Sequence, residues 1–187
     1  MMLTALRVGY IPLVDCAPLV VAAEHGFAEK EGLALDLVRE VSWSNVRDKL
    51  NLGLFDAAHM LAPVAIASSL GLGHVRVPMQ VPLTLSLNGN AITLSPALYD
   101  EIARVAQGEL SDPNVSACAL ATVVRSRASA GSEPLTLGMT FPYSSHNYLL
   151  RDWMAAGGLD PDEDVRLVVL PPPYMVQSLA SGHVDGF

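Results

Sequence analysis

One spaced pattern occurs twice in this sequence and constrains its fold more than any other feature. Leu-x-x-Gly-x-x-Asp occupies Leu50–Asp56 and returns at Leu179–Asp185, 129 positions later. The strand-like segments 6–9 and 135–138, which precede the two copies, keep the same offset. Parallel α/β units share such spacing even without a common origin, so the origin of the pattern stays open. In either case the sequence predicts two similar α/β lobes.

Hydrophobic periodicity in the first half predicts alternating strands and helices. Turn and capping residues place the strands over 6–11, 35–39 and 56–60, and the helices over 18–26, 44–54 and 63–70. We expect Asp15 to cap the first helix and Ser44 the second, because short polar side chains accept the free N–H groups at a helix start. The resulting β-α-β-α-β-α order implies a parallel sheet with right-handed crossovers.

The second half repeats part of this order after a segment of different character. Strands are predicted over 135–141 and 165–170, with another from 184, and helices from Ser144 or Ser145 to 157 and over 175–180. Before them lie an extended crossover over 78–90, a strand over 91–94 and helices over 97–107 and 114–128. We therefore place the lobes at 1–87 and 88–187. Because no helix follows the strand at 184, the second lobe is expected to be incomplete and the chain to be an N-terminal portion.

Composition excludes several classes of protein. Lys and Arg number 11 against 19 Asp and Glu, which gives a net charge of −8 and argues against direct nucleic-acid binding. The 51% of hydrophobic residues and 16% of charged residues indicate a folded chain rather than a disordered one. Apolar runs such as 17–23 and 60–67 are interrupted by proline and fall short of the roughly 20 residues that span a bilayer. No membrane insertion is expected.

The termini and cysteines bear on location. Residues 1–7 lack the basic and apolar regions of a signal peptide, so a cytoplasmic location is expected for the chain as it stands. A periplasmic location is expected instead if a leader has been removed. Cys16 and Cys118 are the only cysteines and are expected to be free thiols.

Enzyme and cofactor motifs are scarce. The sequence contains no GxxxxGK[S/T], GxGxxG, HExxH or GxSxG pattern. The acidic run 160–164 lacks the spacing of a calcium loop. We expect no metal and no cofactor. The turns 12–18 and 142–146 follow predicted strands, and helix N-termini at such places favour small anions.

Five residues are candidates for the binding site, each with a structural alternative. Trp43 either packs in the core or offers its indole N–H. His59 is either a structural histidine at a strand end or a ligand contact. Ser145 and His146 open a helix, where His146 either lies at the surface or donates as a cation. Asn90 offers an uncharged amide at the crossover.

Five segments, in order along the chain, resemble the nitrate- and bicarbonate-binding proteins of ABC transporters. They are Val8–Leu19 (VGYIPLVDCAPL), Ser42–Asp48 (SWSNVRD), Asp56–Pro63 (DAAHMLAP), Asn88–Ile92 (NGNAI) and Thr140–His146 (TFPYSSH). This resemblance implies a type II periplasmic-binding fold, in which two α/β lobes close on a ligand without enzymatic chemistry.

The resemblance also implies roles for individual residues. Trp43 and His146 match residues that contact the anion in nitrate binders, so both are expected to line one cleft from opposite lobes. Asn90 stands where such relatives commonly have Gln. Because Asn is one methylene shorter, a bridging water is expected there.

The ligand and partner are left open among related possibilities. The favoured hypothesis is that the protein binds nitrate or nitrite without enzymatic activity. It would serve either the membrane subunits of an ABC transporter or, as in cytoplasmic nitrate/nitrite sensors of this family, an RNA-binding antiterminator protein. The alternatives are a bicarbonate or sulfonate binder and an enzyme similar to thiamine-pyrimidine synthases. The enzyme is disfavoured because it uses a cysteine-rich motif, and only two cysteines occur here.

Overall fold

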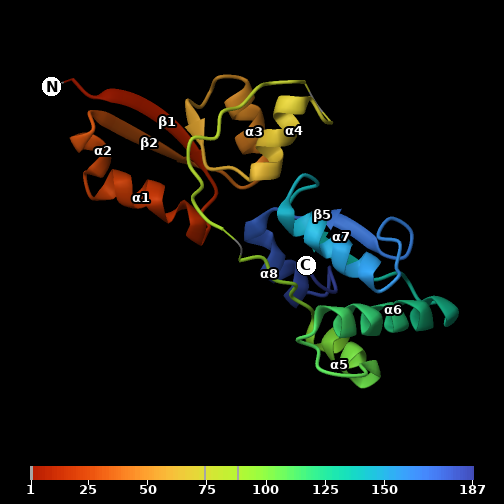
Figure 1. The fold of residues 1–187 in the computed structure, drawn as a ribbon. Coiled ribbons are helices and arrows are strands. Elements are labelled where there is room, and N and C mark those ends of the chain that lie inside the picture. Colours follow the sequence, from red (N-terminus) through yellow and green to blue (C-terminus); the bar gives the residue numbers. More distant parts are fainter. Residues whose placement is uncertain (1, 74, 88) are drawn as a thin grey trace. The chain divides into compact units, whose positions relative to one another are not determined.

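The structure is a computed structural model that describes residues 2–73, 75–87 and 89–187. The chain divides into two compact units, Met1–Gly89 and Asn90–Phe187 (Figure 1). Each unit combines a parallel sheet with flanking helices, so the chain has the predicted α/β fold. The lobe boundary at 87/88 stays a prediction for the complete protein, and Asn88 lies outside the described residues.

Unit 1 is built on three parallel strands in the order β2-β1-β3. The strands are β1 (Thr4–Tyr10), β2 (Leu33–Arg39) and β3 (Ala57–Ala58), and the helices are a 3-10 turn (Val14–Cys16), α1 (Ala17–Glu24), α2 (Phe27–Lys30), α3 (Trp43–Asn51) and α4 (Ala62–Leu70). The alternation of strands and helices is the one predicted from periodicity. The third strand is shorter than expected, because only two of its residues pair with β1.

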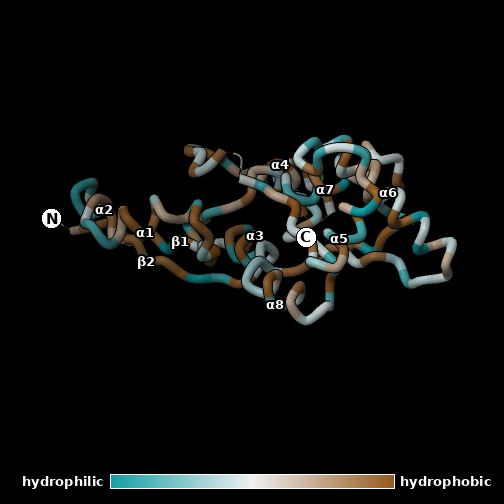
Figure 2. Tube along the Cα trace, turned by 90° about the horizontal axis from the view of Figure 1, so that it is seen from below, coloured by the Kyte–Doolittle hydropathy of each residue, from teal (hydrophilic) through white to brown (hydrophobic). Residues whose placement is uncertain are grey.

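Hydrophobic residues explain how the helices cover this sheet. The tube of Figure 2 is brown along most of β2, and α1 and α2 both contact that strand. On β1 and β3 the covering helix is α3. Gly9 of β1 makes room for Phe55, which lies between α3 and β3, since a Cβ at position 9 would lie 2.3 Å from the Phe55 ring. A side chain there would displace the aromatic ring from the core.

Two predicted helix caps are wrong. Ser42, not Ser44, caps α3: its backbone is extended, and its Oγ accepts from the backbone N–H of Asn45 at 3.2 Å. Ser44 lies inside the first turn, where its own backbone is already helical. Asp15 does not cap α1 either, because it lies in the 3-10 turn and the N-cap position of α1 is Cys16.

Unit 2 has two parallel strands, β4 (Thr136–Met139) and β5 (Arg166–Val169). Its helices are α5 (Pro96–Val105), α6 (Pro113–Ser129), α7 (Ser145–Ala156), a 3-10 turn (Pro172–Tyr174) and α8 (Met175–Ala180). The strands predicted over 91–94 and from 184 are reduced to single bridges, in which Gly186 pairs with Leu94 and Leu137. Buried side chains of α5, α6 and α7 close over β4, with Ile102, Leu120 and Leu150 almost fully buried.

The repeated pattern has the same hydrogen bonds in both units. In unit 1 the Asp56 carboxylate accepts from the Arg7 N–H at 2.8 Å, and the Asp56 N–H donates to the Arg7 carbonyl at 2.9 Å. In unit 2 Asp185 and Thr136 make the same reciprocal pair at 2.8 Å in each direction. The aspartate therefore ties the strand after the second helix of each repeat to the first strand.

None of the helices in the described part of the chain is long and apolar enough to cross a bilayer.

Candidate functional site

The candidate site in unit 1 lies where its strands end. All three strands run parallel, so their carboxyl ends meet at one edge of the sheet. Asp15 follows β1, Trp43 begins the helix after β2, and His59 comes directly after β3. Three connections that are far apart in the sequence thus converge on one edge.

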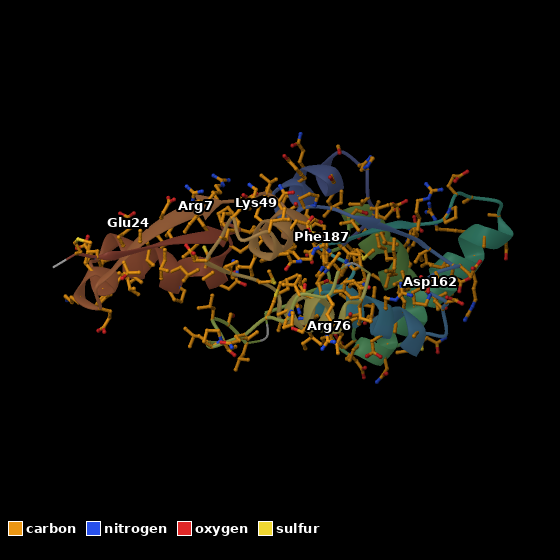
Figure 3. All side chains as sticks on the ribbon, turned by 90° about the horizontal axis from the view of Figure 1, so that it is seen from above. Arg7, Glu24, Lys49, Arg76, Asp162 and Phe187 are labelled. Atoms are coloured by element: carbon orange, nitrogen blue, oxygen red, sulfur yellow. The ribbon has the colours of Figure 1, made fainter. Side chains whose placement is uncertain are left out.

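Two further interactions fix the connection that carries Trp43. The Glu40 N–H donates to the Tyr10 carbonyl at 2.7 Å, which extends the pairing of β1 and β2 beyond the strands. Lys49, labelled in Figure 3, pairs from α3 with the buried carboxylate of Glu40. Ser42 then caps α3, and Trp43 takes the first helical position.

His59 contacts both of the other side chains at this edge. Its Nε2 lies 3.2 Å from Asp15 Oδ2. Its imidazole also meets the Trp43 indole edge to face, with ring centroids 5.2 Å apart and planes at 70°. Trp43 is 1% exposed and His59 3%, whereas the Asp15 side chain is 33% exposed. Asp15 is therefore the member of this cluster that reaches the surface.

Three polar atoms of this cluster lack a hydrogen-bond partner among the described residues. They are Trp43 Nε1, His59 Nδ1 and Asp15 Oδ1, all of them buried. An unsatisfied buried donor or acceptor costs about 1–3 kcal/mol, so native structures rarely retain one without a purpose. The indole N–H can only donate and a carboxylate oxygen can only accept. A polar ligand that reached this edge would find both kinds of group.

The candidate site in unit 2 lies at the start of α7, directly after β4. Ser144 is fully buried and caps the helix: its Oγ accepts from the Asn147 N–H at 3.0 Å and donates to the Phe141 carbonyl at 2.6 Å. The Asn147 amide also donates to the Pro142 carbonyl at 2.9 Å. The N–H groups of Ser145 and His146 open the first turn, where no intrahelical acceptor is available to them. This end of the helix carries a partial positive charge.

The side chain of His146 lies half-buried in this first turn. Burial lowers the pKa of His146 below its usual value of 6.5, because desolvation penalises the charged imidazolium. Its Nδ1 is buried and has no partner in the described part of the chain, as is true of Thr140 Oγ1 and Asn147 Oδ1 nearby in sequence. In the unliganded unit burial thus favours the neutral imidazole, whereas a nearby anion would favour the imidazolium.

The five sequence-predicted residues fall into three places. Trp43 and His59 are brought together in unit 1, and Ser145 and His146 are neighbours at the start of α7 in unit 2. Ser145 is exposed, as is Asn90, the first residue of unit 2. Each unit is described by itself, so the prediction that Trp43 and His146 line one cleft stays a prediction.

Sequence reasoning missed the partner of His59. Asp15 was assigned to a helix start, whereas its carboxylate pairs with the imidazole. The buried amide of Asn147 and the hydroxyl of Thr140 were also missed. The strand-end rule could have found Asp15 and His59 together, because both follow strands of one parallel sheet.

Residues 2–187 match the NMT1-like family. The chain belongs to this family. Among similar NMT1-like relatives, the nitrate import ATP-binding protein NrtC of Synechocystis sp. is 42% identical over 184 residues, which cover 97% of this chain and 25% of that protein. The bicarbonate transport ATP-binding protein CmpC of Synechococcus elongatus is also 42% identical over 184 residues, covering 97% of this chain and 26% of that protein.

A crystal structure supports the same family assignment. The periplasmic nitrate-binding protein NrtA of Synechocystis superposes with a TM-score of 0.84 at 30% sequence identity, over 99% of this chain and 46% of that one. The fold is therefore that of the periplasmic-binding proteins, as predicted. This chain spans about a quarter of the two ATP-binding relatives and just under half of NrtA.

The described residues contain no cluster of three His, Cys, Asp or Glu side chains able to hold an ion. The 187 residues contain no GxxxxGK[S/T] motif. What the geometry offers is hydrogen-bond donors at two strand-end edges.

Proposed function

We propose that this chain is the solute-binding part of an ABC-type import system and binds a small inorganic anion without catalysing its reaction. Nitrate or nitrite is the first candidate for that anion. The same site would serve nitrate sensing if the partner were an RNA-binding antiterminator instead of transporter membrane subunits. The relatives named for nitrate import and nitrate binding support this proposal. NrtA is described as periplasmic, which supports a periplasmic location for the transport role.

The buried indole N–H of Trp43 is the observation that carries the proposal. It is a strong donor that can never accept, it lies at the carboxyl edge of a parallel sheet, and it has no acceptor among the described residues. Nitrate and nitrite offer only acceptors. An oxygen of such an anion would satisfy the indole, and the N-terminal N–H groups of α7 offer donors of the same kind in unit 2.

Bicarbonate is the second candidate because of one specific atom. The equal identity to a nitrate-import and a bicarbonate-transport relative gives no preference between the two anions. Asp15 Oδ1 is a buried acceptor without a partner in the described part of the chain. Bicarbonate carries an O–H that could donate to it, whereas nitrate has none.

Calorimetry on the complete protein tests the proposal, with nitrate, nitrite and bicarbonate titrated separately and chloride as a reference anion. We expect nitrate or nitrite to bind more tightly than bicarbonate and chloride. Trp43→Phe, which keeps an aromatic ring but removes the N–H, should weaken that binding by about tenfold, the worth of one hydrogen bond to a charged group.

Trp153→Phe is the matched control, since the indole N–H of Trp153 already donates to Ser116 Oγ at 3.1 Å. Its affinity should equal that of the unmodified protein. If none of the oxyanions binds more tightly than chloride, the proposal is wrong. Tighter binding of bicarbonate than of nitrate would replace the first candidate by the second.

A further inference from the structure

The cluster at the edge of unit 1 poses an electrostatic problem for the function proposed above. Asp15 is a carboxylate at the edge where the anion is proposed to bind, and two negative charges repel each other strongly when little water lies between them. The Asp15 carboxylate at this strand end therefore disfavours anion binding. His59, which lies next to Asp15, reduces this repulsion.

The contact with Asp15 places a ring nitrogen of His59 opposite the carboxylate. His59 Nε2 lies 3.2 Å from Asp15 Oδ2, and an ionised carboxylate oxygen accepts from an N–H. A proton on Nε2 faces that oxygen, so the imidazole draws the carboxylate toward itself and offsets part of its negative charge.

The same imidazole also contacts Trp43. The two rings meet edge to face at 5.2 Å, and both are almost fully buried. Such aromatic pairs are stabilised beyond simple burial, which favours one ring orientation over another. The direction of the indole N–H is therefore tied to the position of His59, and the position of His59 is tied to Asp15 and to the backbone bond from the His59 N–H to the Gly9 carbonyl at 2.9 Å.

We propose that His59 is a positioning residue rather than an anion ligand. It contacts both the Asp15 carboxylate and the Trp43 indole, so that one side chain offsets the negative charge of Asp15 and orients the donor for the anion. The anion-binding part of this inference rests on the proposed function. The coupling of Asp15, His59 and Trp43 does not, because it exists in the unliganded protein.

A double-mutant cycle in the complete protein tests the inference, using His59→Phe, Asp15→Asn and the double variant. His59→Phe keeps an aromatic ring beside Trp43 but leaves the Asp15 charge without a partner. We expect it to weaken nitrate binding by about tenfold. Adding Asp15→Asn to His59→Phe should recover several-fold of that loss, because the uncompensated charge is then gone. With His59 present, Asp15→Asn should give no such gain.

A spectroscopic readout follows Trp43 without any ligand. In a Trp153→Phe background Trp43 is the remaining indole of residues 1–187. Differences in near-ultraviolet circular dichroism and fluorescence between variants that share this background report the surroundings of Trp43. We expect Asp15→Asn and His59→Phe each to change these signals, and the changes to be non-additive in the double variant. Asp36→Asn removes an exposed carboxylate elsewhere on β2, which pairs with Arg7, and should change neither signal nor affinity.

The outcomes separate the two proposals. Equal effects of Asp15→Asn with and without His59, in both affinity and the Trp43 signals, would overturn the positioning role. If His59→Phe proves too unstable to purify, Asp15→Asn alone decides: unchanged Trp43 signals in that variant would also overturn it. Failure of the unmodified protein to bind nitrate, with the Trp43 coupling intact, would reject the proposed function and retain the positioning role.

Discussion

In both units the candidate donors lie at the carboxyl ends of parallel strands, but different interactions hold them in place. In unit 1, side chains from three connections hold one another: Asp15 binds His59, and His59 packs on Trp43. In unit 2, a single connection is held by helix capping, through Ser144 and Asn147. The first edge is part of a hydrophobic core, whereas the second is a local turn with one half-buried histidine.

This difference separates stability from binding. A donor that also fills the core, such as Trp43, cannot be removed without loss of packing. A donor in the first turn of a helix, such as His146, can be removed at small cost to the fold. Substitutions at the unit 1 edge should therefore act mainly on the free energy of unfolding. Substitutions at the unit 2 edge should act mainly on anion affinity.

Trp43→Ala should have the largest effect, and it should fall on stability. Trp43 is 1% exposed, and large-to-small substitutions of buried aromatic residues cost about 3–5 kcal/mol. The free energy of unfolding, measured by urea denaturation of the complete protein, should fall by that amount. Trp153→Ala should cost less, because Trp153 is only partly buried. An equal or smaller loss for Trp43→Ala would mean that the unit 1 edge is not a core element.

His146→Ala should act mainly on binding. A hydrogen bond from a cationic imidazole to an anion contributes about 1.5–3 kcal/mol, so nitrate affinity should fall by that amount, while the free energy of unfolding at pH 7 changes little. Burial lowers the pKa of His146 in the free protein, and a bound anion raises it again. Binding should take up a proton between those two pKa values and weaken as pH rises through them.

The same histidine predicts the opposite pH trend for stability. Because the folded-state pKa lies below the unfolded value of 6.5, the unfolded chain binds more protons and folding is penalised in acid. The contribution of His146 to stability is lost as pH falls from about 6.5 through the lowered pKa. His146→Gln should flatten this dependence in denaturation experiments at pH 5, 6 and 7. An unchanged slope in that variant, for both stability and affinity, would contradict an ionising role for this side chain.

Asp185→Ala and Asp56→Ala compare the repeated hydrogen-bond pair in the two units. Both carboxylates accept a strand N–H at 2.8 Å, but Asp185 is partly buried and Asp56 is exposed. Loss of a charged acceptor costs about 1.5–3 kcal/mol when the partner is shielded from water, and less at the surface. Thermal unfolding should rank Asp185→Ala as the more destabilising. The reverse order would show that the two copies of the pattern are not equivalent structurally.

Sequence periodicity predicted the order of elements well, and the limits of that prediction have physical causes. The helix predicted over 175–180 matches α8 to the residue. Ser44 was preferred to Ser42 since capping depends on backbone angles that the sequence does not display. The pairing of Asp15 with His59 was missed because it joins two connections that are distant in the chain. Local patterns locate each polar residue at a strand end, but only the sheet brings them together.

Ser144→Ala and Ser42→Ala should have the smallest effects and compare the two edges most directly, since each serine caps the helix that carries a candidate donor. Ser144 is fully buried and makes two hydrogen bonds, whereas the half-buried Ser42 accepts one at 3.2 Å. Cap removal costs about 0.5–2 kcal/mol, and we place Ser144 near the top of that range and Ser42 near the bottom.

Affinity should separate the two serines further. The first turn of α7, which carries His146, is held by the Ser144 cap together with the Asn147 amide, so Ser144→Ala should weaken nitrate binding as well as stability. Trp43 is held by His59 and by core packing, so Ser42→Ala should leave affinity unchanged. Calorimetry on both variants decides the point. A loss of affinity in Ser42→Ala equal to that in Ser144→Ala would mean that Trp43, like His146, depends on its helix cap, and that the side-chain cluster does not hold it.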